Sequence, residues 1–265
     1  MKKEIKELQY YTDELEEKII ELSLKLKNKN NELNEVVDLN NLIFKKLIHN
    51  LKNPVGVSFS FSEMILEGLP NYNPDKLKSH IEIIKNSAEF SLNFLNKLAE
   101  YARYQQPDLK FTFLAYNFNN FINAVIEKAE VLANKKSIRI KKHIPLAVIE
   151  FKFDKNELEI AILNILNNAI RYSKENTEIE VEIVHENPNL IISISDNGIG
   201  LEEKDLSFIF NEFSVVNTYS EDKVKCIGLG LPIAQKIVKK HEGKISVKSE
   251  ILKGSSFTIS LPTNN

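Results

Sequence analysis

Apolar residues recur at heptad spacing along the first 48 residues of the chain. Glu, Lys and Asn fill most of the other positions, and neither Gly nor Pro interrupts the run. A narrow apolar stripe kept over about six heptads favours a two-stranded coiled coil over a single amphipathic helix on a globular body. We therefore expect residues 1–40 to form a parallel coiled coil and the chain to be a homodimer. The two seam sets are Ile5, Thr12, Ile19, Leu26, Leu33, Asn40 and Leu47, and Leu8, Leu15, Leu22, Lys29, Val36 and Ile43.

The next stretch, residues 41–105, has the pattern of a helical hairpin. Apolar residues predict a first helix over 42–69, interrupted at Pro54 because proline removes a helical hydrogen bond. Residues 69–75 contain two prolines and predict the turn. A second helix follows, with apolar spacing of three and four residues from Leu77 to Ala102. Two such hairpins would form a four-helix bundle across a dimer.

Residues 106–265 alternate between helical and strand-like patterns after a linker at residues 105–108. Helices and strands that alternate in this way predict an α/β sandwich, with helices on one face of a mixed sheet. The expected fold class is therefore α + α/β. The helices are expected at 118–133, 156–172 and 228–241, and the strands at 137–143, 148–153, 178–185, 190–194, 244–249 and 255–261.

Composition restricts the classes of function. A formal net charge of −2 gives no indication of a nucleic-acid partner. The single cysteine, Cys226, excludes an internal disulfide and fits a reducing compartment, so we expect a cytoplasmic location. No apolar run is long enough to span a membrane, and the start is too charged for a signal peptide. An input signal would then come from a partner, or from a part of a longer protein that this chain lacks.

Three separated stretches carry candidate chemistry. On the helix expected at 156–172, one face collects Asn164, Asn168, Arg171 and Tyr172, and amide oxygens suit Mg²⁺ while arginine suits phosphate. Asp196 follows an apolar strand, in the pattern Asp196-Asn197-Gly198-Ile199-Gly200. Gly228-Leu229-Gly230-Leu231 opens a helix, where free backbone amides favour anions. Taken alone, the aspartate stretch is more often a plain turn, the amide face fits a solvated helix face, and a lone Gly-x-Gly is nonspecific.

Together and in this order, the three stretches resemble the ATP-binding domain of bacterial two-component sensor histidine kinases. That domain belongs to the superfamily that also holds gyrase, chaperone and mismatch-repair ATPases. Residues 164–172 look like its asparagine box, 196–200 like its first glycine box, and 228–231 like its second. Phe210 and Phe213 look like its phenylalanine box. With the hairpin included, the resemblance covers about residues 40–265.

The resemblance implies that ATP and Mg²⁺ are the cofactors. Asp196 would accept the adenine amine, Asn164 would bind Mg²⁺, and Arg171 would meet phosphate. Residues 211–227 would form a mobile lid. The residues expected at the ATP site are Asn164, Asn168, Arg171, Tyr172, Asp196, Gly198, Ile199, Gly200, Phe210, Phe213, Lys223, Lys225, Gly228, Leu229, Gly230, Leu231 and Ser256.

His49 is the expected phosphate acceptor among the five histidines. It lies nearly opposite Leu47 and Leu51 around the predicted helix, so it should face solvent. His49-Asn50-Leu51-Lys52-Asn53-Pro54 also looks like the family's phosphoacceptor box. By this resemblance, Asn50 would accept a hydrogen bond from the other ring N–H but could not take its proton, and Asn53 would orient water for dephosphorylation of a partner aspartate on a response-regulator receiver domain.

Three residues depart from the family's pattern. Asn50 stands where an acidic residue is usual, Val215 where an arginine is frequent, and Cys226 where glycine is usual. Lys223 and Lys225 would supply the missing positive charge. The sequence therefore favours a dimeric ATP-dependent histidine kinase. The alternatives are a catalytically weak or phosphatase-only scaffold that binds ATP, and another ATPase of the superfamily.

Overall fold

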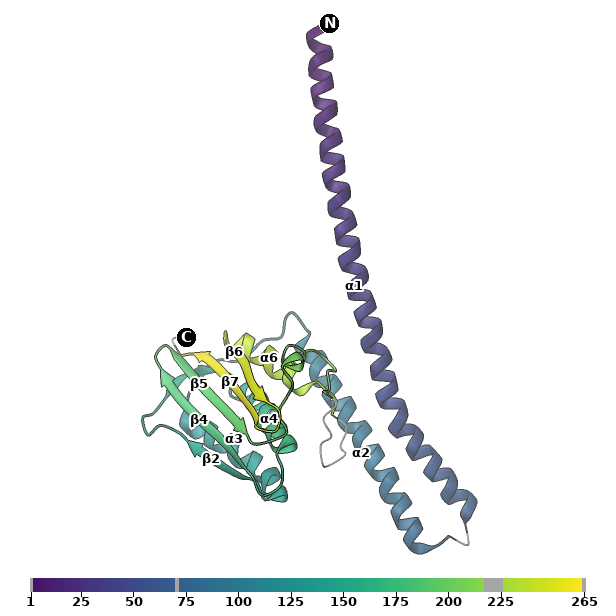
Figure 1. Cartoon of the computed structure of the whole chain (residues 1–265), viewed down its shortest axis with the longest axis vertical. Coiled ribbons are helices and arrows are strands. Elements are labelled where there is room, and N and C mark those ends of the chain that lie inside the picture. The colour runs from purple at the N-terminus through teal and green to yellow at the C-terminus, as the bar shows by residue number, and fades with distance from the viewer. Residues whose placement is uncertain (1, 70–71, 217–225, 264–265) are drawn as a thin grey trace. The chain divides into compact units, whose positions relative to one another are not determined.

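The computed structural model describes residues 2–69, 72–216 and 226–263 of the chain (Figure 1). The elements are α1 (Lys2–Gly68), α2 (Pro74–Tyr104), β1 (Leu114–Asn117), α3 (Phe118–Ala133), the short 3₁₀ helix η1 (Asn134–Lys136), β2 (Arg139–His143), β3 (Glu150–Phe153), α4 (Lys155–Tyr172), β4 (Glu178–Glu186), β5 (Asn189–Asp196), α5 (Glu203–Leu206), α6 (Gly230–Lys240), β6 (Lys244–Glu250) and β7 (Gly254–Pro262). The sequence predicts all of these in this order except β1, η1 and α5.

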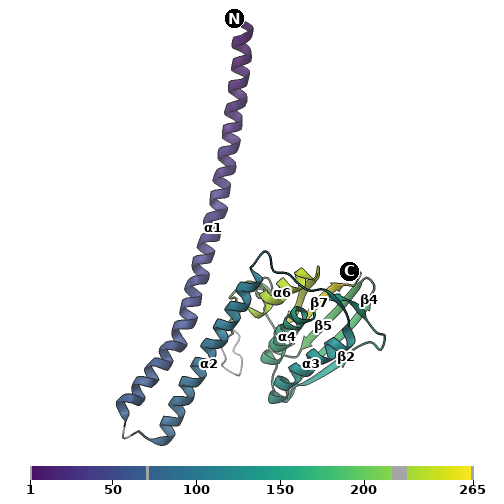
Figure 2. The same ribbon diagram turned by 180° about the vertical axis from the view of Figure 1, so that it is seen from behind.

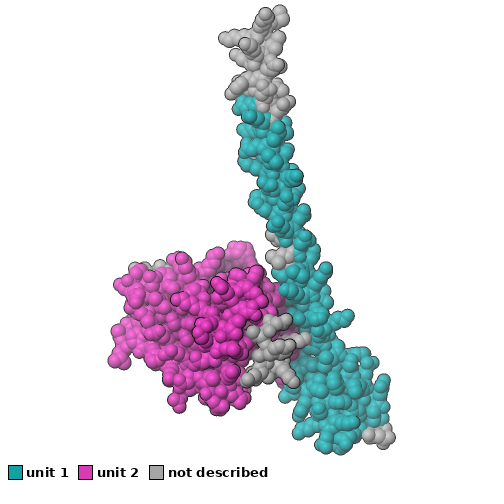
Figure 3. Space-filling model, viewed as in Figure 1, with its two compact units in different colours: residues 1–88 teal, residues 89–265 magenta. Residues whose placement is uncertain are grey.

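The chain divides into two compact units, residues 1–88 and 89–265 (Figure 3). The division falls inside α2, so the amino-terminal part of this helix belongs to the first unit and its last 16 residues, 89–104, to the second. The sequence predicts that the ATP-binding domain begins at residue 106, just after α2 ends, and residues 106–265 all lie within the second unit. Among the described helices, none combines the length and apolarity that crossing a bilayer demands.

The first unit is a helical hairpin. Helix α1 runs without a break through Pro54, so the predicted interruption there is wrong. A proline costs a helix one backbone hydrogen bond, and the many bonds on both sides of it keep the helix continuous. Ser58 Oγ donates to the carbonyl oxygen of Ile84 at 3.4 Å, which ties α1 to α2. Near the turn, His80 packs edge-on against Phe61 and Tyr72.

The apolar heptad stripe of α1 is exposed in the single chain. The side chains of Leu15, Ile19, Leu22, Leu26 and Leu33 are each about 60% exposed or more. Such a stripe on a long helix is energetically unfavourable in water, because burying each leucine or isoleucine is worth about 1.5–3 kcal/mol. The pattern therefore suits a second helix that covers the stripe.

The second unit contains a five-stranded mixed sheet in the order β2-β4-β5-β7-β6. Strand β2 is parallel to β4, and the other pairs are antiparallel. Helices α3, α4 and α6 lie on one face of this sheet (Figures 1 and 2). Alternation explains the layers: Ile179, Val181 and Ile183 of β4 are buried, whereas Glu180 and Glu182 between them are exposed.

Two caps set the positions of the helices that carry the core. Asn117 accepts a hydrogen bond from the backbone N–H of Asn120 and starts α3. Asp154 accepts from the N–H groups of Asn156 and Glu157 and starts α4. The buried face of α4 then packs into the core through Leu158, Ile162, Ile165, Leu166 and Ala169, each at most 1% exposed. The polar face of α4 is thereby fixed on the opposite side.

Candidate functional site

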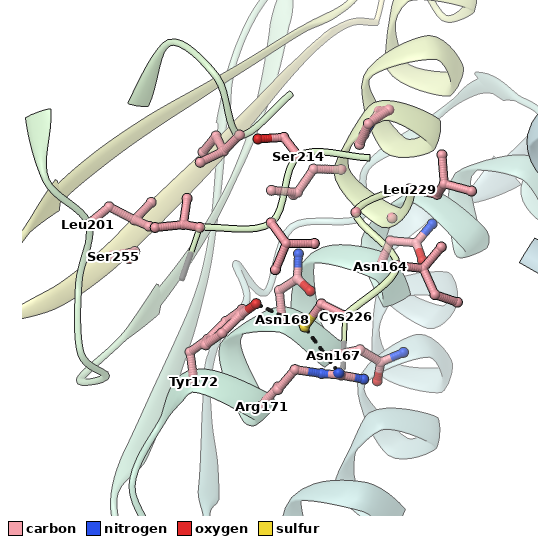
Figure 4. Close-up of a pocket in the computed structure, with 18 of the residues that line it drawn as sticks. Asn164, Asn167, Asn168, Arg171, Tyr172, Leu201, Ser214, Cys226, Leu229 and Ser255 are labelled. Carbon is pink, nitrogen blue, oxygen red and sulfur yellow. Dashed lines mark hydrogen bonds between the residues drawn. The ribbon is translucent and has the colours of Figure 1, made fainter. Parts of the chain in front are cut away.

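Helix α4 lines a cavity of about 270 Å³ in the second unit with its polar face. Asn164, Asn167, Asn168, Arg171 and Tyr172 all lie on this wall (Figure 4). Asn164 is 8% exposed, and its Nδ2 is buried without a hydrogen-bond partner among the described residues. A buried amide donor without an acceptor is costly, by about 1–3 kcal/mol. This wall is therefore arranged for a ligand with hydrogen-bond acceptors.

Asp196 ends strand β5 and lines the same cavity. Its Oδ1 accepts hydrogen bonds from the backbone N–H groups of Gly198 at 2.9 Å and Ser255 at 3.2 Å. Its Oδ2 has no partner among the described residues. Burial raises the pKa of Asp196 to about 6, against the two backbone hydrogen bonds, which lower it. The site thus holds a carboxyl group in one orientation, with one oxygen left for a ligand.

Gly200 and Gly228 form parts of the wall that no side chain can enter. Both have positive φ, 67° and 74°. A Cβ at Gly200 would lie 2.0 Å from the carbonyl oxygen of Glu250, and one at Gly228 would lie 2.6 Å from that of Ser214. Both glycines line the cavity, and a larger residue at either position would force the neighbouring backbone to move.

Other walls come from the chain after β5, from the start of α6 and from β7. The described residues of these walls are Ile199, Gly200, Leu201, Ile209, Ser214, Val215, Val216, Cys226, Ile227, Gly228, Leu229, Gly230, Leu231, Pro232, Ser255 and Phe257. Three segments that are far apart in the sequence thus meet at one cavity: the asparagine stripe (the polar residues 164–172 of α4), the aspartate turn (residues 196–200) and the second glycine box (residues 228–231).

Cys226 contacts the polar wall directly. Its Sγ lies 3.2 Å from Nη1 of Arg171, which donates to it, and 3.0 Å from the hydroxyl oxygen of Tyr172 (Figure 4). The sequence pointed to Cys226 as an unusual lid residue and not as a wall of the site. In this structure Arg171, which is predicted to bind phosphate, donates one of its N–H groups to the Cys226 thiol instead.

A further wall, missed by the sequence analysis, comes from α2. Phe90, Asn93 and Lys97 lie at spacings of three and four residues and line the cavity from one face of this helix. Lys97 Nζ donates to Oδ1 of Asn164 at 3.3 Å. The spacing is visible in the sequence but predicts only a bundle helix, because nothing local indicates which partner this face meets.

The end of α2 is anchored to the rest of the second unit through Tyr101 and Arg103. Tyr101 donates to Glu212, and the ammonium of Lys236 lies 4.7 Å from the centre of the Tyr101 ring. Arg103 forms a bidentate ion pair with Glu157, in which Nη1 donates to Oε1 at 2.7 Å and Nη2 donates to Oε2 at 2.9 Å. Burial and the Glu212 carboxylate raise the pKa of Tyr101, so it stays a donor. The anchors hold the α2 wall in place.

Four residues predicted at the ATP site do not line the cavity. Gly198 packs against the carbonyl of Tyr172, and Phe210 is half-buried. Phe213 is buried and stacks edge-on against Tyr101. Ser256 faces the other side of the sheet and accepts from Ser195 at 2.8 Å, because side chains alternate along a strand and its neighbour Ser255 takes the cavity side. Lys223, Lys225 and most of the predicted lid lie outside the described residues.

The proposed phosphate acceptor lies in the first unit, where the side chain of His49 is exposed. Asn53, one turn further along α1, places its Nδ2 3.4 Å from Nε2 of His49. An amide nitrogen only donates, so in this long contact Nε2 is the acceptor, which means that Nε2 carries the lone pair and Nδ1 the proton. Asn50 is half-buried and makes no hydrogen bond to the ring among the described residues.

Comparison with known proteins gives one family match. Residues 153–265 match the family model described as "Histidine kinase-, DNA gyrase B-, and HSP90-like ATPase". The sensor histidine kinase WalK of Bacillus subtilis (strain 168) is 26% identical over 216 residues, which are 81% of this chain and 35% of WalK. The chain spans less than half the length of the first curated relatives it matches.

Solved structures share the fold. The histidine kinase ThkA, in complex with the response regulator protein TrrA, matches 87% of this chain and 64% of its own chain, with a TM-score of 0.70 and 22% identity. Full-length ShkA in complex with AMPPNP matches 82% of this chain and 45% of its own, with a TM-score of 0.59 and 18% identity. At these identities the likenesses show the helical region followed by the α/β domain, and no more.

Proposed function

We propose that this chain is an ATP-dependent protein-histidine kinase. The premise is its relationship to the two-component sensor histidine kinases with a catalytic ATP-binding domain. Its second unit binds ATP, and His49 receives the γ-phosphoryl group. The observation that carries the proposal is the single cavity onto which the asparagine stripe, Asp196 and the second glycine box all open.

Each part of the cavity suits one part of ATP. Oδ2 of Asp196 accepts a hydrogen bond from the exocyclic amine of adenine, because Oδ1 is already used by Gly198 and Ser255. Arg171 and the free amides at the start of α6 suit the phosphates. AMPPNP, which the ShkA structure contains, is a nucleotide of the same shape.

Asn164 is the residue that would hold Mg²⁺. Its oxygen is a hard ligand of the type this ion prefers, and its unpaired Nδ2 indicates a place built for a polar ligand. Mg²⁺, when bound, neutralises charge on the phosphates. Asn164 would orient it, and the buried wall behind Asn164 would exclude water.

His49 suits the role of nucleophile because its imidazole is exposed and has a lone pair on Nε2. In the reaction Nε2 forms a bond to the γ-phosphorus while the bond to the bridging oxygen breaks and ADP leaves. The proton on Nδ1 is then lost to solvent or to a nearby acceptor. Asn53 is placed to donate to Nε2 before the transfer, and to hold a water molecule during dephosphorylation of a partner aspartate.

The incubation of the full chain with γ-labelled ATP and Mg²⁺ tests this function. A label that is labile in acid and stable in alkali supports the kinase. ATP binding without any label would indicate a scaffold, and release of phosphate without a labelled protein would indicate another ATPase. Either of these two results contradicts the proposal.

The Asn50→Asp variant should label at least about tenfold faster than the parent chain. The carboxylate introduced there could take the ring proton as His49 attacks, and general-base help is worth on the order of 10²–10⁴-fold. Initial rates at saturating ATP measure this effect. Asn50→Ala is the matched control and should gain nothing. If Asn50→Asp labels no faster than the parent, this interpretation of position 50 is wrong.

Adenosine binding should weaken in acid. Adenosine has no phosphates, so its affinity isolates Asp196, whose pKa is about 6. We expect constant affinity above about pH 7 and about tenfold weaker binding at pH 5, because only the ionised carboxylate accepts the amine fully. Titration by calorimetry across pH checks this. Affinity that is unchanged at pH 5 would contradict the role of Asp196.

The same pKa affects folding in the opposite direction. A raised carboxyl pKa means that the contribution of Asp196 to the free energy of unfolding is fully present below the ordinary value of 3.8 and is lost as the pH rises through about 6. Weaker adenosine binding at pH 5 therefore cannot be attributed to this group's destabilising the fold.

Two partners belong to the proposal. A second copy would cover the exposed stripe of α1 that includes Leu15, Leu22 and Leu26, and sedimentation equilibrium should give a dimer. A response-regulator receiver domain would accept the phosphoryl group on an aspartate, as the complex of ThkA with TrrA suggests by its composition. Loss of label from the labelled chain when a receiver domain is added would test this transfer.

A further inference from the structure

We propose that Lys97, on α2, is a phosphate-binding residue of the nucleotide cavity. This inference rests on the proposed function only in so far as the cavity binds ATP. None of the sequence boxes contains Lys97, and the predicted source of the additional positive charge was Lys223 and Lys225.

The position of Lys97 is the first argument. Its Nζ lies 3.3 Å from Oδ1 of Asn164, the atom expected to face Mg²⁺ and the phosphates. Glu100, one turn further along, holds the same ammonium at 2.7 Å. The side chain of Lys97 remains 37% exposed, so its ammonium can move by rotation of its flexible stem. The charge is thus within reach of the phosphate end and is not locked in the core.

Hydrogen-bond donors gather at the same point. Nδ2 of Asn164 is buried and unpaired among the described residues. Helix α6 begins beside it, since a Cβ at Gly230 would lie 3.4 Å from Oδ1 of Asn164. No side chain caps this helix start at Leu229, and the first amides of a helix favour an anion. An amide, a helix start and an ammonium together make a site for an anion.

The charge balance of the cavity is the third argument. Among its described lining residues, the cations are Lys97 and Arg171. Arg171 shares its guanidinium with Cys226, and Val215 is apolar where the resembling family frequently has arginine. The triphosphate tail of ATP carries several negative charges, and transfer of its last phosphoryl group depends mostly on positioning and neutralisation. Lys97 supplies a second cation from a different helix.

Lys97 could instead act as a latch that occupies Asn164 and excludes Mg²⁺. The two roles predict opposite effects of removing the charge: tighter binding of Mg·ATP for a latch, and weaker binding for a phosphate ligand. The unpaired Nδ2 favours the second role, because the contact with Lys97 leaves Asn164 only partly satisfied.

The experiment compares Lys97→Gln with Lys97→Arg in the full chain. Calorimetry measures the affinities for adenosine, ADP and ATP, the nucleotides in the presence of Mg²⁺. We expect Lys97→Gln to weaken ATP binding about 10- to 100-fold and adenosine binding less than about twofold, because a charge-assisted hydrogen bond is lost only with phosphates present. Lys97→Arg should stay within about fivefold of the parent, since arginine also binds phosphate.

Lys128→Gln is the matched control. Lys128 lies on α3 in an ion pair with Glu159, does not line the cavity, and should leave all three affinities unchanged. ATP affinity of Lys97→Gln equal to or above that of the parent overturns the inference, and so does a parallel loss of adenosine binding, which would indicate a structural role. A parent chain that binds Mg·ATP but takes up no acid-labile label contradicts the kinase function alone, and the affinity ratio still decides the role of Lys97.

Discussion

The His49→Ala variant should incorporate no acid-labile phosphate from γ-labelled ATP, while its affinity for ATP stays that of the parent. The reason is that ATP binding and phosphate acceptance are assigned to different units of the chain. The cavity is built entirely from residues of the second unit, whereas the exposed imidazole of His49 belongs to the first. Acid and alkali stability of the label, together with calorimetric titration of ATP, measure both halves of this expectation.

His185→Ala provides the control for this loss. His185 is also exposed, but it lies in strand β4 and outside the cavity lining. Labelling should proceed at the parental rate in this variant. Persistence of acid-labile label in His49→Ala would place the acceptor elsewhere and refute the proposed transfer.

Substitution of Asp196 by asparagine should weaken ATP binding about 100-fold or more. The oxygen of the new side-chain amide could still accept from Gly198 and Ser255, but an NH₂ group would then replace the free Oδ2. Two donors, this NH₂ group and the adenine amine, would face one another in a buried place. Calorimetric titration of ATP measures the loss.

The same variant offers a gain that a damaged fold could not produce. Hypoxanthine carries an oxygen where adenine has its amine, so Asp196→Asn should prefer ITP to ATP, the reverse of the parent. Its melting temperature at pH 8 should be no lower than that of the parent, because the raised pKa means that the ionised carboxylate is unfavourable there. A variant that keeps tight ATP binding and does not gain affinity for ITP would refute the role of Asp196.

Local signals made much of the second unit predictable. The expected helix over 118–133 coincides with α3, because Asn117 caps it and the apolar face is continuous. The strands β4, β5, β6 and β7 were found by alternation. Strand β1 was missed, because it has only four residues and pairs with β3 alone in a separate two-stranded ladder.

The parts of the site that could not be predicted depend on contacts between distant segments. Phe90, Asn93 and Lys97 look like part of an ordinary bundle helix until the second unit places all three at the cavity, with Lys97 bonded to Asn164. The sequence predicts Ser256 at the site, whereas Ser255 lines the cavity in the structure. The pairing of β7 with β5, in which Ser255 lies opposite Asp196, decides which side of the sheet each serine faces. The sequence pattern predicts that side chains alternate along a strand, but which of them face the cavity depends on the strand with which it pairs.

The backbone walls at Gly200 and Gly228 have a consequence for inhibition of this protein. Because Glu250 and Ser214 leave no room for a Cβ at either position, a compound that packs against these two glycines meets surfaces that cannot gain a side chain without rearranging the backbone. Point mutations that confer drug resistance by narrowing a binding site would therefore have to arise elsewhere on its lining.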